Sequence, residues 1–217
     1  MTFDPIFFLL LPVVVLSVVV HECAHGLVAL WNGDPTARER GRLTLHPLAH
    51  LDPVGSLLVP GLLFVLHAPF LIGWAKPVPI DRARLRDPLN GTVRVALAGP
   101  ASNLLLAILF AGLVAVVPER GRFGVLGEMA LAGVVVNCAL ALFNLLPIPP
   151  LDGSWALMRF LPLRHTIALH HFRLIGLALI VALFSAPAIS HAVLGRPIAY
   201  AVRTCLGLFG VQHGPPL

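Results

Sequence analysis

The chain has 217 residues, of which 58% are hydrophobic and only 12% are charged, a composition far outside the range of soluble globular domains. This excludes a soluble enzyme or binding domain and predicts an integral membrane protein. The formal net charge of +5 does not indicate nucleic-acid binding, because the arginines gather in short loops beside apolar segments, a pattern that orients membrane proteins. The three cysteines are too far apart for a disulfide framework or a CxxC metal site.

Five strong apolar segments and one weaker segment predict an all-α polytopic bundle. The strong segments cover 5–31, 54–74, 93–117, 125–148 and 174–195, and the weaker one covers 197–211. The loops between them are too short for a folded module. We therefore expect one membrane domain over 1–217, with no soluble accessory domain and with its core formed by 5–31, 93–117 and 125–155. Whether 197–211 spans the bilayer or lies at its surface stays open.

The first apolar segment contains HECAH, residues 21–25, within a run of branched apolar side chains. Ionisable groups are costly in a membrane helix and usually mark a functional site. His21 and His25 are four residues apart and share one helix face, where two imidazoles can bind one metal ion. Glu22 lies to the side of that face, where it could act on water as a general base, which is the HExxH pattern of zinc hydrolases. The alternative is that these residues only pack within the protein.

A catalytic zinc needs a third protein ligand, and Asp152 is the leading candidate. It is the only acidic residue after Glu128 and lies in NLLPIPPLDGSW, at the end of the fourth apolar segment. A carboxylate there is costly unless water or a cation offsets its charge. The alternative is an ordinary turn residue, since Asp-Gly is a turn signal. Asp52 is less favoured, because nearby arginines offer it partners. The rival ligands are three histidines: His46, His50 and His67.

Two asparagines are candidates for an oxyanion or substrate contact. Asn144 lies eight residues before Asp152 and would share a face with it if that stretch is helical, so its amide could donate to the oxyanion of a tetrahedral intermediate. It could equally satisfy carbonyl groups that the neighbouring prolines leave free. For Asn103, in GPASN, we expect hydrogen bonds between helices packed through Gly99 and Ala101, with a contact to the site as the alternative.

The path of segment 54–74 follows from the loops around it. Loops 32–53 and 75–92 both carry the arginine excess of cytoplasmic loops, and a single crossing between them would put them on opposite sides. Pro60-Gly61 and Ala68-Pro69 interrupt the segment and favour a bent or re-entrant path. We therefore predict that 54–74 crosses the membrane zero or two times.

Three motifs together resemble the site-2 protease family of intramembrane zinc metalloproteases: HECAHG early, LAGPASN in a middle segment and NLLPIPPLDG late. The resemblance extends from the first helix to about Trp155 and is to a compact form without PDZ or CBS domains. It implies that His21, His25 and Asp152 bind one Zn²⁺ per chain and that Glu22 is the catalytic base.

The resemblance also implies a function, the hydrolysis of transmembrane protein substrates near the cytoplasmic side of a bacterial or archaeal cell membrane, as in regulated intramembrane proteolysis. The expected partners are the substrate and the lipid bilayer, with no nucleic acid, and the oligomeric state stays open. GRLTL, residues 41–45, alternates like a short strand and is either a β element that pairs with an unwound substrate or a plain loop. The alternative function is metal binding or transport through the His/Asp cluster, which would not need Glu22.

Overall fold

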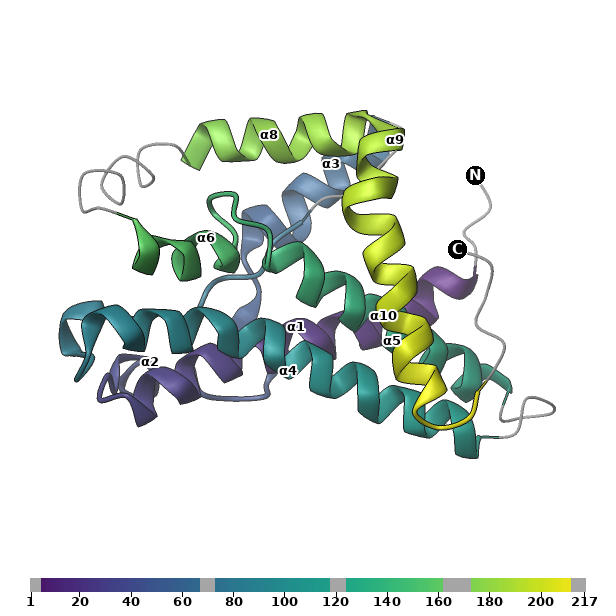
Figure 1. Cartoon of the computed structure of the whole chain (residues 1–217), viewed down its shortest axis with the longest axis horizontal. Coiled ribbons are helices and arrows are strands. Elements are labelled where there is room, and N and C mark those ends of the chain that lie inside the picture. The colour runs from purple at the N-terminus through teal and green to yellow at the C-terminus, as the bar shows by residue number, and fades with distance from the viewer. Residues whose placement is uncertain (1–4, 67–72, 118–123, 162–172, 212–217) are drawn as a thin grey trace.

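The computed structural model describes residues 5–66, 73–117, 124–161 and 173–211, and these residues form helices and loops without a β-strand. Figure 1 shows three long helices side by side: α1 (Pro5–Trp31), α4 (Pro88–Val116) and α5 (Gly124–Asn144). Shorter elements fill the first half of the chain: α2 (Thr36–Glu39), η1 (Pro47–His50), η2 (Pro53–Leu58), α3 (Val59–Val65) and η3 (Arg82–Arg84). The second half adds α6 (Asp152–Leu157), η4 (Met158–Phe160), α8 (Arg173–Ser185), α9 (Pro187–Ser190), η5 (His191–Gly195) and α10 (Arg196–Gly207).

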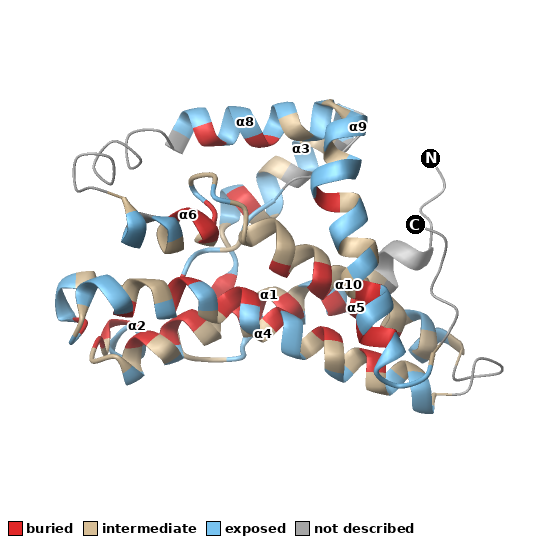
Figure 2. Ribbon diagram, in the orientation of Figure 1, coloured by how far each residue is buried: buried red, intermediate tan, exposed pale blue. Residues whose placement is uncertain are grey.

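The three long helices are membrane-spanning elements by length and composition. Leu10–Trp31, Pro88–Val116 and Gly124–Asn144 contain 22, 29 and 21 residues. A hydrocarbon core of about 30 Å needs roughly 20 residues at about 1.5 Å each, so each helix can cross it. Large apolar side chains cover their outer faces, while the buried residues gather where the helices meet (Figure 2). The prediction of an all-α polytopic membrane protein is confirmed.

Small residues let these helices approach closely. Ala107 and Ala111 of α4 pack against Val134 and Cys138 of α5, and all four side chains are fully buried. Association in lipid depends on such packing, because lipid tails are as apolar as the helix surfaces. Close packing of α4 on α5 therefore forms part of the bundle core.

The two C-terminal apolar segments form helices that meet at a sharp bend. The chain does not continue as one helix from 174 to 195, because it bends by 98° between Leu174–Ser185 and Pro187–Gly207. Pro187 cannot donate a helical hydrogen bond and forces the preceding Ala186 out of helical geometry. The described chain thus has three candidate spans, or four if the bent pair is one span.

The two ends of segment 54–74 lie side by side. The Trp74 amide donates to the Gly55 carbonyl at 3.1 Å, and Ser56 Oγ donates to the Trp74 carbonyl at 2.9 Å. Residues 67–72 lie outside the described residues, but the two ends of the segment are in contact. This agrees with a path that does not cross the membrane once.

The loops on either side of this segment pack against each other. Arg84 Nη1 donates to Glu39 Oε2 at 2.8 Å, and Asp34 Oδ2 accepts from the Asp81 amide at 2.7 Å. The buried Asp34 carboxylate also accepts from Thr36, and these hydrogen bonds lower its pKa even though its burial acts in the opposite direction. Both basic loops therefore lie on one face of the bundle.

The β element considered for 41–45 is not formed. The stretch is a loop, since no other part of the described chain lies beside it as a paired strand. The amides of Gly41 and Arg42 donate to the carbonyls of Arg38 and Ala37 at 3.0 and 2.8 Å. The Thr44 carbonyl accepts from Cys23 Sγ at 3.0 Å and from His50 Nε2 at 2.8 Å. A strand needs a ladder partner, and this chain does not supply one.

The contact between the loops predicts a labelling result. Single cysteines placed at Arg40 and Arg84 should react with a membrane-impermeant maleimide from the same side of a sealed vesicle, with the unsubstituted protein as the control for the native thiols. Reaction from opposite sides would contradict the fold.

Candidate active site

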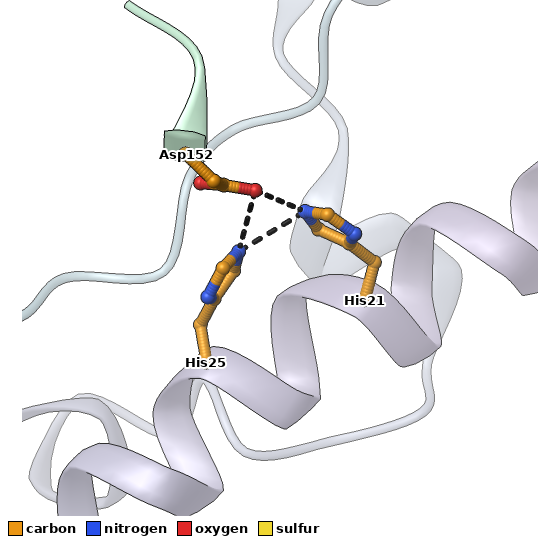
Figure 3. Close-up of side chains that lie close together, drawn as sticks. All are labelled: His21, His25 and Asp152. Carbon is orange, nitrogen blue, oxygen red and sulfur yellow. Dashed lines mark hydrogen bonds and ion pairs between the residues drawn. The ribbon is translucent and has the colours of Figure 1, made fainter. Parts of the chain in front are cut away.

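Three side chains from distant parts of the chain converge beside the C-terminal half of α1 (Figure 3). His21 Nε2 and His25 Nε2 lie 3.0 Å apart, and Asp152 Oδ2 lies 3.1 Å from the first nitrogen and 3.4 Å from the second. Both imidazoles are buried, and Asp152 is half-buried at the first residue of α6. Within the described residues this is the one group of three or more His, Cys, Asp or Glu side chains that could hold a metal ion.

The far nitrogen of each imidazole has an oxygen partner on α4. His25 Nδ1 lies 2.6 Å from the Val95 carbonyl oxygen, which can only accept, so this nitrogen carries the hydrogen. His21 Nδ1 lies 2.6 Å from Asn103 Oδ1 and donates in the same way. In a neutral imidazole the other nitrogen then has a lone pair. Both Nε2 atoms therefore point lone pairs at Asp152.

This leaves three acceptors facing one another. Asp152 Oδ2 is a buried carboxylate oxygen without a hydrogen-bond donor among the described residues when the two imidazoles are neutral. Such an arrangement is repulsive unless a cation lies between the atoms. Two imidazole nitrogens and one carboxylate oxygen are ligands that zinc prefers, and three protein ligands leave a fourth position open. The residues fit a catalytic zinc ion.

Gly99 of α4 makes room for the imidazole pair. A β-carbon at this position would lie 2.5 Å from both His21 Nε2 and His25 Nε2. No flexible side chain could give way, because both rings are fixed by their Nδ1 contacts. The GPASN motif thus supplies both the space for the rings, at Gly99, and the acceptor for His21, at Asn103.

Two contacts hold α6, which carries Asp152, against the rest of the site. The guanidinium of Arg82 lies 3.3 Å from the centroid of the Trp155 ring, and Arg159 Nε donates to Asn90 Oδ1 at 3.0 Å. Burial lowers the pKa of Arg82 to about 10, so it remains a cation at neutral pH and can stack on the indole. These contacts join α6 and η4 to the loop before α4 and to the start of α4.

Glu22 lies apart from the three converging atoms. Its Oε2 accepts a hydrogen bond of 2.8 Å from the amide of Val78, in the loop between the 54–74 segment and α4. The side chain is half-buried. Because Glu22 follows His21 directly, it leaves α1 on a neighbouring face, and a loop amide rather than a helix sets its orientation.

Three curated proteins are similar to this chain over most of its length. "Putative zinc metalloprotease YwhC" of Bacillus subtilis is 41% identical over 154 residues, which cover 66% of this chain and 67% of that protein. "Putative zinc metalloprotease Rip2" is 33% identical in Mycolicibacterium smegmatis, with 86% of this chain and 70% of that protein covered, and 33% identical in Mycobacterium tuberculosis, with 91% and 72% covered. No family model and no solved structure matches the chain.

The chain belongs to the site-2 protease family of zinc metalloproteases. The family prediction is confirmed, and together with the apolar helices it makes the protein a multi-pass membrane metalloprotease. The names of the relatives imply zinc, the metal that the donor set around Asp152 fits.

Asn144, a further candidate residue of this site-2 protease, is not on a shared face with Asp152. α5 ends at Asn144 and the chain to Asp152 is a series of turns, so the helical condition for that expectation fails. The amide of Asn144 donates to the Leu140 carbonyl of its own helix at 3.0 Å. Both donor contacts of Asn103 are engaged, with Ser17 and Asn137, so an oxyanion contact would require breaking one of them. Ala101, expected beside it in a helix contact, is exposed.

The rival ligands lie elsewhere. Asp52 Oδ1 accepts from the amides of Val54 and Gly55, so backbone groups, rather than the expected arginines, are its partners. His50 is buried and bonds to Thr44, and His46 is exposed. His67 lies outside the described residues. Asn137 and Ser17, which reach the site through Asn103, were not expected, although polar side chains in apolar helices were a usable signal.

The close packing at Gly99 predicts the effect of one methyl group. Gly99→Ala should weaken zinc binding by roughly tenfold or more, because overpacking costs about 1–3 kcal/mol and tenfold corresponds to about 1.4 kcal/mol. Zinc affinity is measured by chelator competition. Gly127→Ala is the matched control in α5, where the added carbon meets only Val117 at 3.8 Å. Equal affinities in the two variants would show that Gly99 does not confine the imidazoles.

Proposed function

We propose that this protein is an intramembrane zinc metalloprotease that hydrolyses peptide bonds of transmembrane protein substrates near the cytoplasmic side, as in regulated intramembrane proteolysis. The observation that carries the proposal is the convergence of His21 Nε2, His25 Nε2 and Asp152 Oδ2 inside a bundle of apolar helices. The names of the relatives support the metalloprotease chemistry. The location of the site within a spanning helix supports a substrate that is itself in the membrane.

Each polar residue of the site has a role in this proposal. His21, His25 and Asp152 hold one zinc ion, which supplies a Lewis acid that polarises the scissile carbonyl and makes water a better nucleophile at neutral pH. Glu22 is the general base that takes the proton from the attacking water. Its bond to the Val78 amide uses one carboxylate oxygen and leaves Oε1 for the water. A transport site would need no such base, so Glu22 favours hydrolysis.

The site lies at a depth that water can reach. His25 precedes the end of α1 at Trp31 by six residues, or roughly 9 Å of helix. The arginine-rich loops lie at that end, and arginine-rich loops face the cytoplasm in most membrane proteins. Both features support cleavage near the cytoplasmic surface.

The loop at 41–45 offers a place for the unwound substrate. A transmembrane helix satisfies its own amides, so a peptide bond must leave the helix before it can react. The amides of Leu43 and Leu45 have no hydrogen-bond partner among the described residues. Leu43 and Leu45 also line a groove of about 330 Å³ between this loop and α1, and Cys23, the residue after Glu22, lines it from α1. An extended substrate segment could pair with this loop by edge addition.

The base assignment predicts that zinc binding and turnover separate. Glu22→Gln should retain zinc and lower cleavage by about 10²–10⁴-fold, because the amide can still accept from Val78 but cannot take a proton. The assay uses purified protein and a model transmembrane peptide, with and without chelator, and zinc content is measured on the same samples. Cleavage near the unsubstituted rate would remove Glu22 as the base. Zinc binding without chelator-sensitive cleavage by the unsubstituted protein would favour metal binding or transport.

The ligand assignment predicts different results at two aspartates. Asp152→Ala should abolish cleavage and weaken zinc binding by more than the roughly 10–100-fold typical of outer hydrogen-bond partners. Asp52→Ala removes only a cap worth about 1 kcal/mol and should leave zinc content and cleavage largely intact. Metal content per purified chain and peptide cleavage are the readouts. The reverse pattern would assign the third ligand to the loop.

A further inference from the structure

A chain of buried polar side chains runs from the centre of the bundle to His21. Ser17 of α1, Asn103 of α4 and Asn137 of α5 are each 0% exposed. Asn103 Nδ2 donates to Asn137 Oδ1 at 2.8 Å and to the Ser17 carbonyl at 3.3 Å. Asn137 Nδ2 donates to Ser17 Oγ at 2.8 Å and to the Gly133 carbonyl at 2.9 Å. Every link joins different helices except the last.

Ser17 and Gly133, at the end of this network away from His21, determine which group donates in each of its hydrogen bonds. The Ser17 hydroxyl donates to the Val13 carbonyl at 2.7 Å, so its oxygen is left as an acceptor. The Gly133 carbonyl is also an acceptor. The Asn137 amide must therefore direct its NH₂ group towards both of them and its oxygen towards Asn103.

The same argument passes to the next amide. Because Asn137 presents an oxygen, Asn103 must present its NH₂ group, and its own oxygen then faces His21 Nδ1 at 2.6 Å. That oxygen requires a hydrogen on Nδ1, which leaves the lone pair on Nε2. If the Asn103 amide turned over, its oxygen would face the Asn137 oxygen and its NH₂ group would donate to Nδ1 of His21. Nδ1 would then carry no hydrogen, and Nε2 would carry it and lose its lone pair.

We propose that Asn137 is a positioning residue that selects the tautomer of His21. It does not reach the site itself. Its bond to Asn103 is the shorter of the two that hold the Asn103 amide, the other being the 3.3 Å bond to the Ser17 carbonyl, and it thereby favours the one orientation that makes His21 a metal ligand. The inference rests on the proposed function in one respect, namely that His21 binds zinc. His25 needs no such device, since its partner is the Val95 carbonyl, which cannot turn over.

A purely structural role for Asn137 is the competing explanation, because the same bonds also join three helices. The two explanations differ in what happens to the metal site of folded protein. Loss of a helix contact lowers thermal stability without changing the ligand geometry. Loss of the amide orientation changes zinc affinity and the electronic environment of the ion.

The test compares zinc affinity and the visible absorption spectrum of the Co²⁺-substituted protein, which reports ligand geometry. Asn137→Ala should weaken zinc binding by about 10–100-fold, the effect typical of outer partners of a ligand histidine, and should alter the Co²⁺ spectrum. Val134→Ala is the matched control, since Val134 is equally buried on α5 but packs in the apolar core. It should lower thermal stability while zinc affinity and the Co²⁺ spectrum stay unchanged.

A conservative variant tests the direction of the bonds. Asn137→Asp stays protonated in so apolar a site, so it can donate to Ser17 or Gly133 and present an oxygen to Asn103. It should restore zinc affinity to within a few fold of the unsubstituted protein. If Asn137→Ala does not fold, Asn137→Leu fills the space with an apolar side chain and should show the same loss.

The outcomes separate this inference from the proposed function. Unchanged zinc affinity and an unchanged Co²⁺ spectrum in folded Asn137→Ala or Asn137→Leu would overturn the role of Asn137 while leaving the zinc site intact. Failure of the unsubstituted protein to bind zinc more tightly than a His21→Ala variant would instead overturn the metal site itself.

Discussion

The structure depends on one electrostatic constraint, which is that two imidazole lone pairs and a carboxylate oxygen meet within 3.4 Å inside an apolar bundle. A single proton relieves only part of that contact, whereas a divalent cation between the three atoms relieves all of it. The rest of the core is arranged around it. Glycine at position 99 leaves space for the two imidazole rings. The contacts of Arg82 and Arg159 hold α6 and η4 in place, so that Asp152 faces the histidine pair.

The buried amides contribute more to orientation than to stability. Hydrogen bonds between membrane helices average about 0.6 kcal/mol each, so the links of Asn103 and Asn137 together are worth only a few kcal/mol. A carbonyl partner such as Val95 fixes His25 with no further residues. An amide partner can turn over, so Asn103 is held by the Ser17 carbonyl at 3.3 Å and by Asn137 at 2.8 Å, and Asn137 is oriented in turn by the Ser17 hydroxyl and the Gly133 carbonyl. The length of the network therefore follows from the choice of asparagine as the partner.

Site residues could be predicted from the sequence where they lie in one helix or where a charged residue stands alone in an apolar region. The spacing of His21 and His25 follows from helix geometry alone, and Asp152 stood out because no other acidic residue is near it in sequence. Gly99 and Asn137 could not be assigned, because their meaning depends on which helix faces α1 and at what height. The bend at Ala186 was not predicted, because the apolar run 174–195 continues through Pro187, the residue that causes the bend. The loop at 41–45 has the alternation of a strand but no partner strand within the described residues.

The metal-ligand candidates and the candidate base lie on different faces of α1. His21 and His25 point at α4, where rigid neighbours hold the ligands. Glu22 and Cys23 point at loops, towards Val78 and Thr44, and Cys23 and Thr44 line the groove beside α1. In the proposed mechanism the metal must stay fixed while a substrate segment enters, and one helix meets both demands because adjacent residues lie about 100° apart around its axis. A rigid helix contact therefore serves the zinc, and a loop contact serves the base and the peptide.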